Sequence, residues 1–144
     1  MKAIRFYYIY AALFVLAACG RNSPIVGDWK LSEIDIEKAI EVFDEQQKDF
    51  ARAMMTEAFD NVKGRLTISF ESDGKYKIET PLINGDVKSE SGKWRLSLNH
   101  KKLTLMPKSS DKEVHRVLHL SEDKLVMEMN QAGFGEMEMT FVRD

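Results

Sequence analysis

Apolar and polar residues alternate along most of the chain after Arg65, which is the pattern of strands with one buried and one solvent-facing side. Residues 66–70 and 75–79 show it clearly, and Ser72-Asp73-Gly74 between them favours a tight hairpin turn. The alternation returns in Trp94, Leu96 and Leu98; in Leu103 and Leu105; in Leu118 and Leu120; in Leu125, Met127 and Met129; and in Met137, Met139 and Phe141. With residues 25–34 as the first strand, the pattern predicts an antiparallel meander of about eight to nine strands.

A helical rhythm interrupts the strands between Ile36 and Val62, a stretch without Gly or Pro. Its apolar positions are Ile36, Ile40, Phe43, Phe50, Met54, Ala58 and Val62. Asp35 can cap the start, and Gly64 follows the end. We predict a helix of about seven turns, either unbroken or broken once near Gln46 and Gln47. Its apolar stripe would cover an end or a face of the sheet.

The first eighteen residues have a different character. Lys2 and Arg5 make a positive start, and residues 6–18 carry no charge. This apolar run is shorter than the ~20 residues that span a bilayer. A basic start, a short apolar core and small residues near a cleavage site are typical of a secretory signal peptide, so we expect the protein to be exported.

Leu16-Ala17-Ala18-Cys19 resembles the lipobox of bacterial lipoproteins. The resemblance implies cleavage before Cys19 and acylation of that residue, for example with palmitate. It divides the chain into a signal peptide at 1–18, a lipidated tether at 19–24 and a domain at 25–144. Gly20 stands where an aspartate would favour inner-membrane retention, so we expect an anchor in the lipid of the outer membrane. The alternative is an ordinary signal peptide cleaved near Gly20.

Composition narrows the possible partners of the exported domain. Removing residues 1–18 leaves 126 residues, a length that suits one domain. The whole chain has a net charge of −2, and loss of Lys2 and Arg5 makes it −4. Nucleic-acid binding needs a basic stripe, which this mildly acidic chain does not have, so we exclude that class. One cysteine cannot form an internal disulfide.

Gly27-Asp28-Trp29 matches the Gly-x-Trp motif that opens the first strand of lipocalins and fatty-acid-binding proteins. Later segments, among them "FESDGKYKIET" and the closing "FVRD", are similar to bacterial lipocalin-like lipoproteins. The resemblance implies an up-and-down β-barrel of about eight strands, with one helix between the first and second. It also implies that Arg143 packs over Trp29 and closes one end of the barrel, with Gly27 beside them. The alternative for Arg143 is a terminal side chain in water.

Two features depart from the lipocalin pattern. The helix follows the first strand, as in fatty-acid-binding proteins, and the chain is shorter than most lipocalins. A small or partly collapsed barrel, or a strongly curved open sheet, therefore stays an alternative to a deep calyx.

The sequence offers little for catalysis or metal binding. His115 and His119 would stand about 13 Å apart on a strand, and their phase, opposite to Val114, Leu118 and Leu120, predicts that they face solvent. Phosphate-loop, zinc-helix and nucleophile-elbow motifs do not occur. We expect no enzyme activity, cofactor or metal. Five carboxylates fall in outward phases and predict a solvated face: Glu71, Glu79, Glu128, Glu136 and Glu138.

Methionines in the inward phases of the last two strands suggest a soft, adaptable interior, although ordinary core packing explains them too. Arg116 shares the phase of Leu118, which predicts a cation inside the barrel. The resemblance to fatty-acid-binding proteins implies that this cation could hold a carboxylate. The alternative is that Arg116 reaches water at the edge of the strand. The expected pocket comprises Trp29, Phe50, Met54, Tyr76, Trp94, Arg116, Met127, Met129, Met137 and Met139. The leading hypothesis is a module that binds a small hydrophobic or amphipathic ligand in the bacterial cell envelope. The alternative is an envelope assembly or inhibitor protein with a filled barrel.

Overall fold

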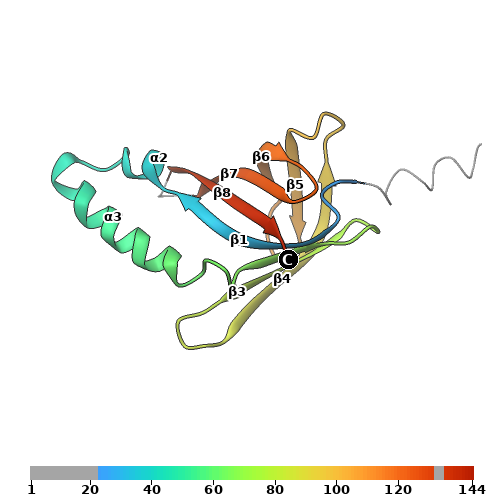
Figure 1. Ribbon diagram of the computed structural model, residues 1–144, viewed down its shortest axis with the longest axis horizontal. Helices are drawn as coiled ribbons and strands as arrows, with labels where there is room; N and C mark the ends of the chain where they lie inside the picture. Colours follow the sequence, from blue (N-terminus) through green and yellow to red (C-terminus); the bar gives the residue numbers. More distant parts are fainter. Residues whose placement is uncertain (1–22, 132–134) are drawn as a thin grey trace, which may run out of the picture.

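The computed structural model describes residues 23–131 and 135–144, and in these residues eight strands and two helices form one barrel-shaped domain (Figure 1). The strands are β1 (Gly27–Asp35), β2 (Thr67–Phe70), β3 (Lys75–Pro81), β4 (Val87–Leu96), β5 (Lys102–Pro107), β6 (Glu113–Leu120), β7 (Lys124–Gln131) and β8 (Gly135–Arg143). The helices are α2 (Glu37–Ile40) and α3 (Glu45–Asp60).

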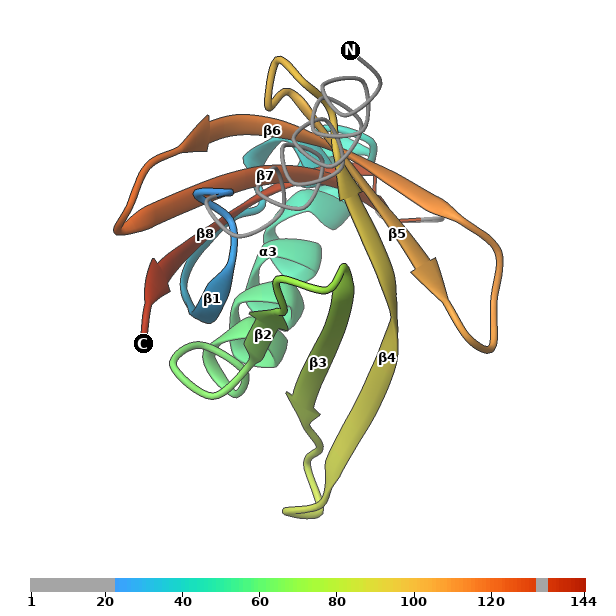
Figure 2. The ribbon, with the colours of Figure 1, turned by 90° about the vertical axis from the view of Figure 1, so that its right-hand side faces the viewer.

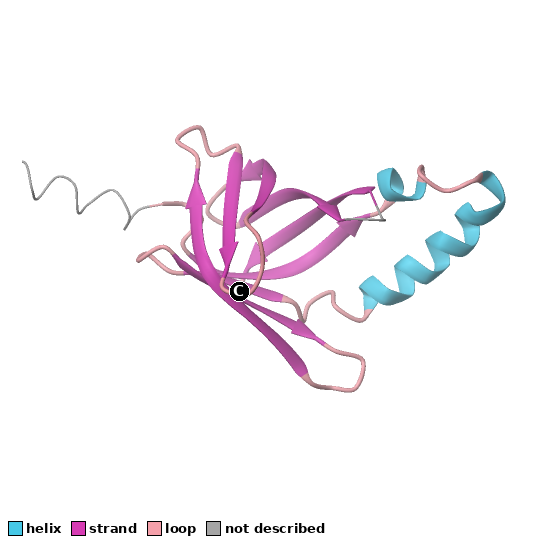
Figure 3. Ribbon diagram, turned by 180° about the vertical axis from the view of Figure 1, so that it is seen from behind, coloured by secondary structure: helices cyan, strands magenta, loops and turns pink. Residues whose placement is uncertain are grey.

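Each strand pairs antiparallel with the next, and β8 returns to pair with β1, so the sheet closes into a barrel. The strands form one wall in Figure 3, with both helices beyond one of its ends. The predicted up-and-down barrel with helical structure between the first and second strands is confirmed. Closure removes the alternative of an open curved sheet, because every strand now has two hydrogen-bonded neighbours.

The predicted single helix is wrong in one respect. The chain leaves the helical path at residues 41–44, between α2 and α3, rather than near Gln46. This break rotates α3 about its axis relative to α2. The apolar side that Ile36 and Ile40 define on the first helical turn therefore does not continue along α3. Phe50 and Met54 are 70% and 56% exposed, whereas Ala51 and Met55, one residue further along, are buried.

One end of the barrel, here called the closed end, is filled by side chains. Trp29 is completely buried there, and its Nε1 donates to the carbonyl oxygen of Ile25 at 2.7 Å. The guanidinium carbon of Arg143 lies 4.2 Å from the centroid of the Trp29 ring. Arg143 also donates to the carbonyl oxygens of Pro24 and Val26, at 2.9 and 2.8 Å. The chain therefore enters the domain at the closed end.

Gly27 makes room for this arrangement. Its φ of 135° lies where side chains are rarely tolerated, and a Cβ atom there would stand 2.0 Å from Nη1 of Arg143. The structure thus brings together the three residues that the sequence assigned to barrel closure.

The opposite end, here called the mouth, carries the helices. β1 ends at Asp35 and leads directly into α2, and the chain then runs through α3 to β2. Figure 2 looks along the barrel and shows α3 crossing behind its interior, while Figure 1 places α3 beyond one end. The two views together place α3 across the mouth.

Candidate cavity at the barrel mouth

A cavity of about 700 Å³ occupies the mouth half of the barrel. This volume lies within the range of roughly 300–1,000 Å³ typical of small-molecule sites. Most of its wall is apolar and comes from α3, the segment that follows it, and six strands: β2, β3, β4, β6, β7 and β8. The lining residues are Ala58, Phe59, Val62, Leu66, Ile68, Ile78, Thr80, Lys88, Glu90, Glu113, Val114, His115, Met129, Asn130, Met137, Met139 and Phe141. The barrel is therefore packed at one end and hollow at the other.

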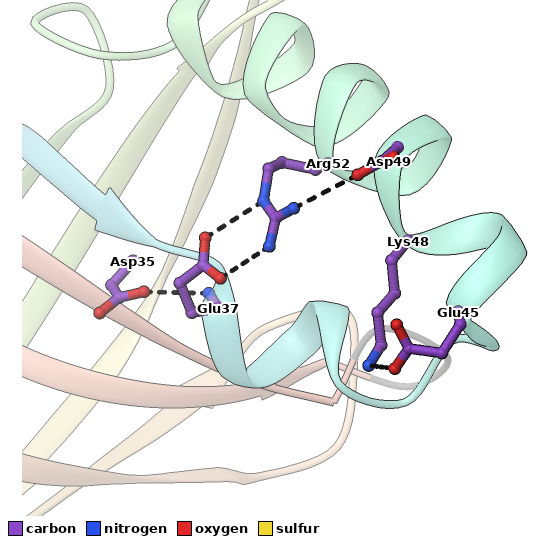
Figure 4. Close-up of polar contacts among 6 residues, drawn as sticks. All are labelled: Asp35, Glu37, Glu45, Lys48, Asp49 and Arg52. Carbon is purple, nitrogen blue, oxygen red and sulfur yellow. Dashed lines mark hydrogen bonds and ion pairs between the residues drawn. The ribbon is translucent and has the colours of Figure 1, made fainter.

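Polar contacts join α2 and α3 at the bend between the two helices (Figure 4). Arg52 of α3 grips the Glu37 carboxylate of α2 through two hydrogen bonds, of 3.3 and 2.9 Å. Asp35 accepts a hydrogen bond from the backbone N–H of Glu37 at 2.9 Å, so the residue predicted to cap the helix does satisfy one of its first donors. The Arg52 and Glu37 side chains are 44% and 64% exposed, so this pair adds only modestly to the packing of buried Ala51 and Met55 of α3.

A second set of contacts ties α2 to the barrel wall. Nζ of Lys38 donates to Oε2 of Glu128 on β7 at 3.0 Å. Arg116 of β6 reaches the same carboxylate from the other side, with Nη2 2.6 Å from Oε1. Glu128 points outward as predicted, but it is only 8% exposed rather than solvated, because these two cations cover it. They also lower the pKa of Glu128, Arg116 most strongly.

The predicted inward direction of Arg116 is wrong. Arg116 lies on the outer face of the barrel, while its neighbours His115 and Val117 are buried. The cause is a β-bulge in β6: Val117 pairs with Met127 and His119 with Val126, which leaves Leu118 as an extra residue. Leu120 faces the core. In a regular strand Leu118, Arg116 and Val114 would face the same side as Leu120, but the extra residue at the bulge reverses the side of every residue before it. The prediction that His115 faces solvent fails for the same reason.

Two polar pairs lie at the cavity. The hydroxyl of Tyr76 donates to Oε1 of Glu90 at 3.2 Å. Nε2 of His115 lies 3.2 Å from Oε2 of Glu113. Burial and the charges of Glu90 and Glu113 raise the pKa of the Tyr76 hydroxyl well above its usual value, with burial the largest cause. Both carboxylates are therefore close to the same buried ring.

The expected pocket residues separate into several groups, all within the described part of the chain. Met129, Met137 and Met139 line the cavity. Met127 is 1% exposed and packs in the core with Trp29 and Tyr76. Trp94 stands edge-on to Phe70 with the ring centroids 5.7 Å apart, and its Nε1 donates to the carbonyl oxygen of Glu71 at 3.0 Å. Phe50 and Met54 lie on the exposed side of α3, and Arg116 lies outside the barrel.

Sequence reasoning missed the polar residues of the cavity: Glu90, Glu113 and His115. For Glu90 a signal existed, because it lies four residues before Trp94 and so shares its phase on β4. For Glu113 and His115 the bulge removed the signal.

The four other carboxylates that the sequence placed on a solvated face differ in exposure. Glu71 and Glu136 are exposed, and Glu79 and Glu138 are half-buried.

The remaining functional predictions concern the lipid anchor, metal binding and membrane spans. Cys19 falls outside the described residues, so the structure does not place it. Within 23–131 and 135–144 there is no group of three or more metal-ligating side chains that could hold an ion. No helix in that part of the chain is long and apolar enough to cross a bilayer.

Comparison with known proteins supports the fold. The chain resembles the crystal structure of a lipocalin-like protein from Bacteroides uniformis with a TM-score of 0.55 and 12% identity, covering 85% of this chain and 100% of that one. An uncharacterized protein from Bacteroides eggerthii gives a TM-score of 0.52 and 11% identity, covering 83% and 99%. A comparison with curated protein sequences finds no match. The profile of the lipocalin-like domain matches residues 25–127, and the chain therefore belongs to the lipocalin-like domain family.

Proposed function

We propose that this protein is a lipid-anchored binding module of the bacterial cell envelope, and that its cavity holds a small apolar or amphipathic molecule. The observation that carries the proposal is the hollow mouth half of the barrel, with about 700 Å³ of space behind a predominantly apolar wall. Interiors of small domains are otherwise close-packed, with few voids larger than a water molecule. A cavity of this size is therefore best explained by an occupant.

The lining supports an occupant of variable shape. Met129, Met137 and Met139 come from neighbouring strands and present flexible thioether side chains to the same space. Methionine adapts to irregular apolar surfaces at little cost. Binding rather than catalysis is the role we assign, because the lipocalin-like family to which the chain belongs is typically one of binding proteins.

The anchor is the second part of the proposal and rests on the sequence alone. The lipobox-like Leu16-Ala17-Ala18-Cys19 supports acylation of Cys19 and attachment to the lipid of the outer membrane. The domain begins a few residues later, so the cavity would be held close to that membrane.

Uptake of N-phenyl-1-naphthylamine, a neutral dye that fluoresces in apolar surroundings, tests the cavity. Ala58 of α3 lines the cavity, and its replacement by tryptophan should fill the mouth and reduce uptake strongly. Glu57→Trp places the same bulk at the exposed neighbouring position and should leave uptake unchanged. Equal uptake by the parent and Ala58→Trp would contradict the proposed site, and no uptake by the parent would contradict a binding cavity.

One observation favours a second candidate, an interaction protein that docks on an envelope partner. Phe50 and Met54 are large apolar side chains on the outer side of α3, 70% and 56% exposed. A partner bound through them should be lost in Phe50→Ser while dye uptake persists. A stoichiometric small molecule in solvent extracts of protein purified from its native envelope would favour the ligand-binding function instead.

A further inference from the structure

Charged side chains line the cavity and bear on which head group an apolar ligand can carry. Glu90 and Glu113 both line it, and His115 beside them is 5% exposed. Arg116, the cation expected inside from the sequence, lies outside with Glu128. Among the described lining residues, the two carboxylates are therefore opposed by a single lysine, Lys88.

Lys88 does not neutralise this cluster. It pairs with Thr80, nearer to the mouth than Glu90, which pairs with Ile78, and its side chain is exposed. Lys88 and Lys108 also border a polar hollow of about 490 Å³ on the side of β4, which Glu90 touches as well. Solvent screens the exposed ammonium of Lys88 and also the carboxylate of Glu113, whose side chain is 48% exposed. Half-buried Glu90 is therefore the least screened charge of the cavity.

The two carboxylates of the cavity accept hydrogen bonds from neighbouring side chains. Oε2 of Glu113 lies 3.2 Å from Nε2 of His115, and a carboxylate oxygen in this position accepts the hydrogen bond. Glu90 keeps its second carboxylate oxygen free of Tyr76, which donates to Oε1. Tyr76 is thus a positioning residue that holds Glu90 at the cavity.

We propose that the cavity selects ligands whose apolar body ends in an amine or another hydrogen-bond-donating cation, over ligands that end in a carboxylate. An ammonium group would make charge-assisted hydrogen bonds to Glu90 and Glu113 while its chain contacts the methionine wall. A fatty-acid carboxylate in the same place would face the like charge of half-buried Glu90 and, closer to solvent, that of Glu113. This inference rests on the proposed ligand-binding function and names the chemical class of its ligand.

Three twelve-carbon probes with one chain and different heads test the inference: dodecylamine, dodecanol and dodecanoate. Each competes at pH 7 with N-phenyl-1-naphthylamine for the parent protein, below its micelle concentration. We expect dodecylamine to displace the dye at a concentration at least about tenfold lower than dodecanoate, as one charge-assisted hydrogen bond provides. Dodecanol should fall between them.

Glu90→Gln and Glu113→Gln keep shape and remove charge, so each should reduce the preference for dodecylamine over dodecanoate several-fold while dye uptake persists. Tyr76→Phe removes the hydroxyl that hydrogen-bonds Glu90 and should reduce the preference for dodecylamine by a smaller factor. Glu33→Gln removes an exposed carboxylate of β1 outside the cavity and should leave the preference unchanged. Dye uptake in each variant shows that its barrel is folded.

The outcomes separate the two proposals. Dodecanoate binding as tightly as dodecylamine, or a preference that survives in Glu90→Gln and Glu113→Gln, overturns the head-group inference and leaves the binding function standing. Failure of the parent to take up the dye or any of the three probes, measured directly by calorimetry, overturns both.

Discussion

Arg116 and Glu128 form an ion pair on the outside of the barrel, with Nη2 of Arg116 2.6 Å from Oε1 of Glu128. Lys38 of α2 shares the same carboxylate, so this pair is also the point where the helical segment attaches to the wall. Its effect is twofold: the interior loses a cation, and the mouth gains a fixed support for α2.

The first prediction concerns pH. Hydrogen bonds from Arg116 and then Lys38 lower the pKa of Glu128 in the folded protein below 4.5, its ordinary value. A lowered folded pKa stabilises the fold above the unfolded pKa, and this contribution is lost as pH falls through the folded value. Glu128→Gln should therefore lower the Tm at pH 7, and the difference from the parent should shrink as the pH falls below about 4.5.

Thermal unfolding followed by circular dichroism between pH 7 and pH 3 measures this difference. Glu33→Gln removes an exposed carboxylate of β1 that pairs with Thr140 of β8, away from Glu128, so it is the control and should follow the parent closely. A Tm difference for Glu128→Gln that stays constant over the whole range would show that the ionised pair does not hold α2.

The closed end gives the second prediction. Trp29 is fully buried, so Trp29→Ala should reduce the free energy of unfolding by about 3–5 kcal/mol. Arg143→Ala should cost less. Because the two side chains stack at 4.2 Å, a double-mutant cycle should show a coupling of at least ~0.5 kcal/mol. Urea denaturation of the four proteins measures it, and strict additivity would show that the stack contributes nothing.

The third prediction compares Met127, which packs in the core, with Met129, which lines the cavity. Met127 is 1% exposed and packed on all sides, so Met127→Ala should cost about 2–5 kcal/mol and leave dye affinity unchanged. Met129 already faces the cavity, so Met129→Ala should destabilise less and change dye affinity. Met129→Leu conserves volume and should be nearly neutral for stability. An equal loss of stability in both alanine variants, with no change in binding, would favour a filled interior.

The fourth prediction tests the anchor. Cys19→Ala removes the thiol that the lipobox-like sequence would expose to acylation, so the precursor should stay uncleaved by the lipoprotein pathway and the mature acylated form should disappear. Mass spectrometry of the parent should show acyl chains on Cys19. A soluble, unmodified mature chain that starts at another residue would contradict lipidation.

Regular elements of this fold were readable from the sequence, and irregular ones were not. The hairpin around Ser72-Asp73-Gly74 joins β2 and β3 as its turn chemistry predicts, and the alternation placed Met137, Met139 and Phe141 correctly on the inner side of β8. Both successes depend on strictly local rules, the geometry of a tight turn and the period of an extended chain.

Errors arose where one residue or one turn breaks the period. The bulge at Leu118 reverses the direction of Arg116 and His115, and the break at residues 41–44 rotates the buried face of α3 from Met54 to Met55. A bulge is fixed by pairing with a neighbouring strand, which the sequence of one strand does not reveal. The same bulge places Arg116 outside the barrel and Glu113 at the cavity, so a local irregularity changed the ligand chemistry that the sequence predicts.

The entry of the chain at the closed end has a consequence for traffic to and from the membrane. Arg143 holds the backbone at Pro24 and Val26, and only residues 20–22 lie between Cys19 and Ser23, four residue steps along the chain. Four steps reach at most about 14 Å, whereas the eight residues of β7 extend over about 26 Å. In a chain anchored through Cys19, as proposed, the mouth therefore cannot face its own bilayer head-on. It would open toward the aqueous compartment or the opposing membrane, so cargo would be received from or delivered to that side.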